Sequence, residues 1–192
     1  NGFGTGARNI NGGAIGSTAT GTSPNARING INVGGDFQIG ISGSAGSASS
    51  TANMTLSGTG STVNLGEATR TITLGSSGSM TFGGVISNGG LKLTRNANGA
   101  AGSFGLSGTN TFASGLTIDG VVVNATNHNA ALGVGAVTLG GNSGFNTTLN
   151  LRSALTIAND ITMADTAGTK TITSFGANAI ISGTITNNDS TG

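Results

Sequence analysis

The sequence contains no cysteine, no tryptophan and no tyrosine, and only one proline, Pro24. Without cysteine, a disulfide framework and thiolate metal sites are excluded. Without tryptophan and tyrosine, the chain lacks the broad aromatic faces on which sugars usually stack, and its aromatic residues are seven phenylalanines.

Charge is also scarce, since only 7% of the residues are charged and the formal net charge is +1. The chain has no basic stripe that could neutralise phosphates and no polybasic cluster for an anionic membrane surface. No apolar run approaches the roughly 20 residues that span a bilayer. We therefore expect neither a nucleic-acid partner nor membrane insertion.

Glycine is abundant, with 37 of 192 residues. Each glycine in regular structure costs roughly 0.5–1 kcal/mol relative to alanine, so the fold needs a repeated source of stabilisation. Continuous strand ladders would supply it. Disorder is the competing interpretation, but disordered segments are poor in β-branched residues, and Ile, Val and Thr recur along this whole chain.

Apolar residues alternate with polar ones at a spacing of two, which is typical of short, half-buried strands. The alternating sets are Phe37, Ile39 and Ile41; Ile72 and Leu74; Leu91 and Leu93; Val137 and Leu139; and Leu149 and Leu151. No segment of eleven or more residues has helical spacing with caps, so we predict an all-β fold with essentially no helix.

The sequence also repeats itself at an offset of about 100 residues, in blocks near 34–88 and 134–188. Residues 69–73 (TRTIT) match residues 169–173 (TKTIT), and Gly83 and Asn88 match Gly183 and Asn188. A unit of this length would contain several coils of roughly 20 residues, within the range of solenoid repeats. We predict one elongated β-solenoid domain over residues 1–192, in which residues 42–52 form a loop or a loose coil.

Residues 91–141 resemble the passenger-associated repeat of bacterial autotransporters. The glycine-rich turn and the Asn-Thr-aromatic corner of that repeat correspond to residues 106–112 (LSGTNTF), and its next strand to residues 115–118 (GLTI). Its Ala-Leu-Gly step and Val-Thr-Leu strand correspond to residues 131–133 and 137–139. The resemblance implies a right-handed parallel β-helix, exported to the cell surface as part of an adhesin or another secreted effector.

Parallel β-helices also include glycan-degrading enzymes, which need clustered carboxylates. The six acids are scattered along the chain: Asp36, Glu67, Asp119, Asp160, Asp165 and Asp189. Only Asp160 and Asp165 lie close together, and we interpret them as solvated turn residues rather than as cation ligands. Residues 34–36 (GGD) approach a calcium-solenoid motif but do not recur.

Other side chains that could carry chemistry are equally isolated. His128 is the only histidine, and without a positioned nucleophile and acid it cannot form a triad, although Asp119 could approach it across one coil. Arg70 and Lys170 are expected at corners, in water, before strands that begin at Thr71 and Thr171. Six phenylalanines are expected in the core, with Phe3 left open as a contact: Phe37, Phe82, Phe104, Phe112, Phe145 and Phe175. The threonine pairs on alternate positions, such as Thr71 and Thr73, are interpreted as an ordinary outward strand face.

The sequence therefore predicts a secreted structural or adhesive β-solenoid of a bacterial surface protein, with no catalytic residue, no cofactor and no metal. Solenoid ends expose unpaired strand edges, so we expect them to pair with further coils of a longer polypeptide or with neighbouring copies in a filament. A ligand on a host or neighbouring cell is a further expected partner. The alternatives are a polysaccharide-degrading β-helix and a pilin-like antiparallel sandwich that polymerises by strand donation.

Overall fold

The described part of the chain consists of strands and turns, without helix. The computed structural model describes residues 6–15, 30–40, 54–57, 60–75, 78–97, 102–176 and 178–188. Specific predictions were made for Phe3, Ile41, Asp189 and the segment 42–52, and all of these lie outside the described residues. None of the described residues belongs to a helix that is long and apolar enough to cross a membrane.

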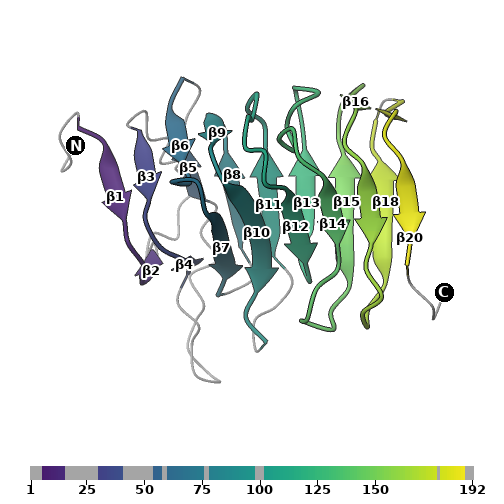
Figure 1. Cartoon of the computed structure of the whole chain (residues 1–192), viewed down its shortest axis with the longest axis horizontal. Helices are drawn as coiled ribbons and strands as arrows, with labels where there is room; N and C mark the ends of the chain where they lie inside the picture. Colours follow the sequence, from purple (N-terminus) through teal and green to yellow (C-terminus); the bar gives the residue numbers. More distant parts are fainter. Residues whose placement is uncertain are drawn as a thin grey trace.

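The strands form three sheets and one short strand pair, and sheet B extends from the first described coil to the last (Figure 1). Sheet A contains β1 (Arg8–Ile10), β3 (Ile31–Val33), β6 (Thr62–Asn64) and β9 (Val85–Ser87). Sheet B contains β2 (Ala14–Ile15), β4 (Phe37–Ile39), β7 (Thr69–Leu74), β10 (Gly90–Arg95), β12 (Leu116–Asp119), β14 (Val137–Leu139), β17 (Ile161–Met163) and β20 (Ile185–Asn187). Sheet C contains β5 (Met54–Ser57), β8 (Ser79–Phe82), β11 (Ser103–Leu106), β13 (Val122–Ala125), β15 (Thr147–Leu151) and β18 (Lys170–Ser174), and the short pair is β16 (Thr156–Ile157) with β19 (Ile180–Ile181).

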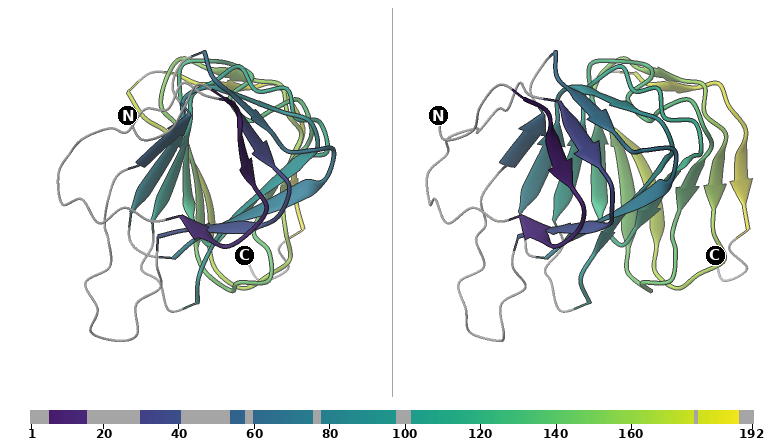
Figure 2. Two further views of the ribbon diagram at one scale, coloured as in Figure 1. Left: turned by 90° about the vertical axis from the view of Figure 1, so that its left-hand side faces the viewer. Right: turned by 60° about the vertical axis from the view of Figure 1, so that its left-hand side comes forward.

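Strands that follow one another in the chain lie mostly in different sheets, and every described strand pair is parallel. Viewed from the N-terminal end, the chain runs clockwise as it recedes from the viewer (Figure 2, left). The molecule is therefore a right-handed parallel β-helix, as predicted. Parallel pairing also excludes the antiparallel sandwich of a pilin-like subunit for the described residues.

Hydrogen bonds between neighbouring coils give the length of a coil. Side-chain contacts from one coil to the next join residues that are 21 to 28 positions apart, as from Asn110 to Ala131 and from Arg152 to Asn124. The predicted period of roughly 20 residues is close to this value. One coil is longer, since Asp36 accepts a hydrogen bond from the backbone of Thr71, 35 positions later.

Inward-facing side chains form continuous columns because each strand pairs in register with the strand of the next coil. In sheet B, one column contains Leu91, Leu116, Val137 and Ile161. These four side chains are at most 1% exposed. Apolar burial of this kind is repeated in every central coil and offsets the backbone cost of the many glycines.

Phenylalanines occupy the core at four of the six predicted positions, since Phe37, Phe82, Phe104 and Phe112 are at most 4% exposed. The prediction is wrong for the other two. Phe145 lies half-buried in a corner loop, where the Arg95 guanidinium stacks 3.8 Å from the ring centroid. Phe175 follows the last strand of sheet C and is 50% exposed, because no described coil lies beyond it.

The 100-residue offset does not correspond to one constant position in the coil. Phe37 and Val137 both lie in sheet B, whereas Ile72 lies in sheet B and its match Ile172 lies in sheet C. Both isoleucines nevertheless occupy inward columns, Ile72 against Leu93 and Ile172 against Leu149. The matched letters thus reflect a shared strand pattern on two different faces.

Two basic residues differ from the prediction, because their strands begin earlier than expected. β7 begins at Thr69 and β18 at Lys170, so Arg70 and Lys170 lie within strands. Both are half-buried rather than solvated. Carbonyl groups of the preceding turns satisfy them: Arg70 Nε donates to the Leu65 oxygen at 2.9 Å, and Lys170 Nζ donates to the Thr166 oxygen.

Sheet A is interrupted between β9 and β16, and a buried asparagine replaces part of its ladder. Asn110 is fully buried; its Oδ1 accepts a hydrogen bond from the Ile86 N–H at 2.8 Å, and its Nδ2 donates to the Ala131 oxygen at 2.6 Å. One side chain therefore connects three successive coils. Asn159 has a related role in the following coil, where its Nδ2 donates to the carbonyl groups of Gly133 and Gly135.

Candidate functional site

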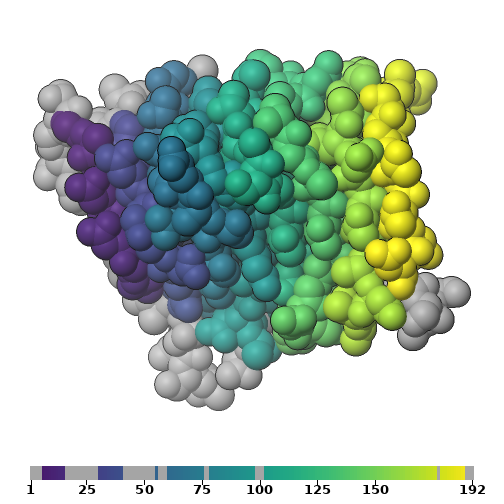
Figure 3. All heavy atoms as spheres, in the orientation of Figure 1, coloured from purple at the N-terminus to yellow at the C-terminus, as the bar shows by residue number. Residues whose placement is uncertain are grey.

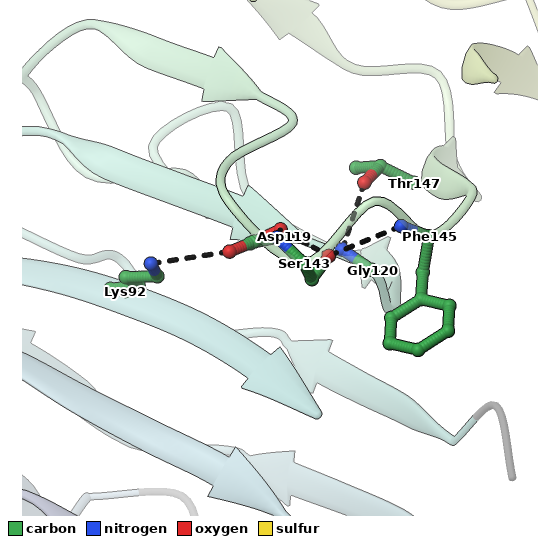
Figure 4. A network of polar contacts seen from close by, with 6 residues as sticks. All are labelled: Lys92, Asp119, Gly120, Ser143, Phe145 and Thr147. Atoms are coloured by element: carbon green, nitrogen blue, oxygen red, sulfur yellow. Dashed lines mark hydrogen bonds and ion pairs between the residues drawn. The ribbon is translucent and has the colours of Figure 1, made fainter. Parts of the chain in front are cut away.

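A network of polar contacts lies at the corner where sheet B passes into sheet C (Figure 4). Asp119 ends β12, and Gly120 turns the chain with a φ of 75°. Strand alternation directs Asp119 outward, but the corner loop of the next coil, which contains Ser143 and Phe145, folds over it. Asp119 is consequently only 2% exposed.

Three contacts hold the Asp119 carboxylate. Lys92 Nζ lies 3.2 Å from Oδ2, and Ser143 donates to Oδ1 from its backbone nitrogen at 3.2 Å and from its hydroxyl at 2.5 Å. The side chain of Lys92 is 31% exposed and that of Asp119 is 4% exposed. A buried carboxylate with a charged partner and two donors is well compensated for its loss of hydration.

The same geometry leaves little capacity for catalysis at this corner. The Ser143 hydroxyl donates to Asp119 and accepts from the Phe145 N–H at 3.3 Å, so both of its ordinary roles are in use. Thr147 is likewise engaged, because its Oγ1 accepts from the Gly120 N–H at 2.9 Å. We interpret this network, from Lys92 to Thr147, as a lock that joins the corners of adjacent coils.

The acids that the sequence singled out do not assemble into a centre. Asp160 is exposed and accepts a hydrogen bond from the Thr184 N–H at 2.8 Å, and Asp165 is exposed as well. Asp36 accepts from the Thr71 N–H. Within the described ranges, no group of three or more His, Asp or Glu side chains could hold a metal ion.

His128 lies in the exposed turn after β13. Its backbone nitrogen donates to the Thr126 oxygen, and its carbonyl accepts from the Ala131 nitrogen. Asp119 precedes β13, and the four residues of that strand separate the two by roughly 13 Å at the usual rise per residue. The approach of Asp119 to His128 that the sequence allowed is therefore not made.

A second organised surface is the outer face of sheet C. Its outward positions form two columns in register from coil to coil. The first contains Ser79, Ser103, Val122, Thr148 and Thr171, and the second contains Thr81, Gly105, Asn124, Asn150 and Thr173. Sequence analysis missed these columns, because threonine pairs that are irregular along the chain become neighbours only once the register is known.

One shallow open groove of about 260 Å³ lies beside β16. It is lined mainly by small and apolar groups: Asn129, Ala130, Gly133, Val134, Thr156, Ala158 and Asn159. Val134 is 64% exposed there. The lining contains no acid or base, so the groove has no residue suited to proton transfer.

The chain has no significant match among the protein-family models, the curated proteins or the solved structures with which it was compared.

Proposed function

We propose that this chain is a segment of an extracellular structural or adhesive rod of a bacterial surface protein, and that it has no catalytic activity. The parallel β-solenoid supports the proposal because stacked coils supply reach and many similar surfaces without a pocket. The resemblance of residues 91–141 to exported repeats supports the extracellular location.

The observation that carries the proposal is the state of the last described coil. β18, β19 and β20 each pair with a described strand on one side only. Ile185 continues the column of Ile161, yet it is 47% exposed whereas Ile161 is fully buried. An apolar column whose last side chain is exposed, in strands that pair with a described strand on one side only, favours a further coil as its cover.

The opposite end of the stack has a different character. Arg8 in β1 pairs with Ile31, which in turn pairs with Val63, so a charged residue stands first in an inward column. Inward-pointing charges at a sheet edge discourage further pairing. We therefore favour continuation of the same polypeptide beyond β20 over stacking of the N-terminal coil of a second copy.

An association measurement tests this proposal. The isolated chain should associate through its exposed end as concentration rises, and Ile185→Asp should abolish the association because the apolar column then ends in a charge. Val134→Asp is the matched control, since Val134 is also exposed but lies on a middle coil. Sedimentation velocity and electron microscopy report the outcome.

Three results would count against the proposal. Only short single rods at high concentration would show that the end is not adhesive. Equal loss of association in both variants would remove the role of the end. Long filaments would favour head-to-tail assembly of copies over a continuous rod. The enzyme alternative has its own test, because turnover of any member of a glycan panel, abolished by Asp160→Ala or Asp165→Ala, would replace the structural function.

A further inference from the structure

We propose that the outer face of sheet C binds the ordered water lattice of an ice crystal. The inference goes beyond the role of the chain as a rod, and it rests on the two outward columns of sheet C rather than on the exposed end. The strands that carry these columns lie side by side along the molecule (Figure 2).

Composition distinguishes this face. Its outward positions carry hydroxyls, amides and methyl groups, without charge and without aromatic rings. Charged side chains occur only at its margins, where Lys170 begins β18 and Arg152 follows β15. Arg152 is exposed, and its Nε donates to Oδ1 of the outward Asn124 at 2.7 Å, so its guanidinium lies against the edge of the second column.

The outward side chains of sheet C are also held at regular positions. The four pairings from β8 to β18 contain no register shift, and outward side chains are mostly half-buried against their neighbours. Threonine has a restricted χ1 angle, and Asn150 Nδ2 donates to Asn124 Oδ1 at 3.0 Å, which ties one coil to the next. The outward positions thus repeat at about 4.8 Å along the rod and about 6.7 Å along each strand. All of them except Val122 and Gly105 carry a hydroxyl or an amide.

Such an array suits a partner that is itself periodic and rigid. A single protein–water hydrogen bond gains little, because liquid water offers the same bond. The side chains of this array lose their conformational freedom when the chain folds, so binding does not have to order them again. A crystal face also contacts many positions of the array at once. A dissolved glycan chain would have to lose its own conformational freedom, and this face lacks the aromatic rings that usually compensate.

Sheet B is the natural comparison, because it also carries a threonine column. Thr117, Thr138, Thr162 and Thr186 stack in register along its outer face. Lys92 belongs to the same column, because it pairs with Thr117. The next outward residue of β12 after Thr117 is Asp119, which is covered by the corner loop. Sheet B therefore also has two outward columns, since Thr73 and Thr94 stack with Asp119. Each of them contains a charged residue, whereas the two columns of sheet C contain none.

The test compares one substitution on each face. Thr148→Lys places a charge in the middle of sheet C, and Thr138→Lys places the same charge in the middle of sheet B; both threonines are half-buried outward residues of strands. Ice recrystallisation and the shape of growing ice crystals are measured with each protein, and circular dichroism verifies that each variant is folded. We expect the unmodified chain to slow recrystallisation, Thr148→Lys to require roughly tenfold more protein, and Thr138→Lys to leave the effect unchanged.

A smaller change separates the lattice from a general effect of charge. Thr148→Val removes one hydroxyl while it keeps the shape, so a modest loss is expected. Absence of any effect of the unmodified chain on ice would overturn the proposal, as would equal loss in the sheet B and sheet C lysine variants. Binding to crystalline cellulose or chitin, abolished by Thr148→Lys and without an effect on ice, would assign the face to a glycan instead.

Discussion

The Asn110 side chain makes hydrogen bonds that backbone pairing makes elsewhere in the sheets. The backbone around it does not form a ladder with β9, yet the Ile86 N–H and the Ala131 carbonyl are buried and need partners. An asparagine carries a donor and an acceptor at the end of one short side chain, which is what two such groups on opposite sides require. This explains in physical terms why an Asn-Thr-aromatic corner suits a β-helix.

Asn110→Ala is therefore expected to lower the free energy of unfolding by more than the substitution of an exposed asparagine would. The substitution leaves two buried backbone groups without partners, at about 1–3 kcal/mol for each. Chemical denaturation monitored by circular dichroism measures the change. Asn129→Ala is the control: its Oδ1 accepts from the Thr156 N–H at 2.9 Å, but at an exposed site where water replaces it, so a change within about 0.5 kcal/mol is expected. Equal losses in the two variants would contradict this role for Asn110.

Asp119 is a residue whose burial depends on the neighbouring coil. Its position at the end of an alternating strand indicates an exposed carboxylate, and it becomes buried only because the loop of the next coil closes over it. Gly141 permits the closure, since a Cβ there would lie 2.4 Å from Asp119 Oδ2. Contacts between coils of this kind are not visible in the local sequence.

At the scale of the element, the turns depend on glycine for two separable reasons. Gly133 has a φ of +77°, and a Cβ there would lie 2.5 Å from the ring of Phe112, which is fully buried. Gly176 has nearly the same φ, +78°, but a Cβ there would meet no atom within 4 Å. The pair isolates backbone strain from steric overlap.

Alanine at these two turns should therefore have unequal effects. Gly176→Ala should cost about 1–2 kcal/mol, because an L-residue is strained in the left-handed region. Gly133→Ala should cost about 1–3 kcal/mol more, because the buried Phe112 ring cannot move away. Thermal unfolding of both variants measures the difference. Similar melting temperatures would mean that the ring yields and that backbone strain alone requires glycine.

Some of the strands could be predicted from the sequence, whereas their sheet assignment could not. Alternation located the cores of β4, β7, β10, β14 and β15, since an inward residue at every second position is a local property. The face on which a strand lies depends on how many residues each corner consumes, which varies from coil to coil. Ile72 and Ile172 thus have nearly identical neighbours and lie in different sheets. The two outward columns of sheet C were hidden for the same reason.

At the scale of the whole molecule, stability should decline from the middle of the stack toward the last described coil. Strands such as β12 and β14 have paired neighbours on both sides and buried columns beneath them. All three residues of β20 are exposed (Figure 3, right edge). In a solenoid each coil is stabilised mainly by its nearest neighbours, so an end coil has only half of these contacts.

Hydrogen exchange measures that gradient directly. Amides of β20 should exchange through local opening, at rates well above those of β12, and protection of β17 should be intermediate. A chain bearing a cover on this end, such as an additional coil, should show β20 protected as well as β12. Uniform protection of all three strands in the isolated chain would contradict nearest-neighbour stabilisation.

The parallel ladders also determine how the rod would respond to mechanical load. Strands wind around the long axis, so the hydrogen bonds between coils point along it. A pull on the two ends stretches these bonds in series, and each coil opens a few bonds at a time instead of resisting with a whole sheet in shear. A rod of this construction would yield in small steps and lengthen by one coil per step, so a sudden load would be absorbed gradually instead of breaking the whole stack at once.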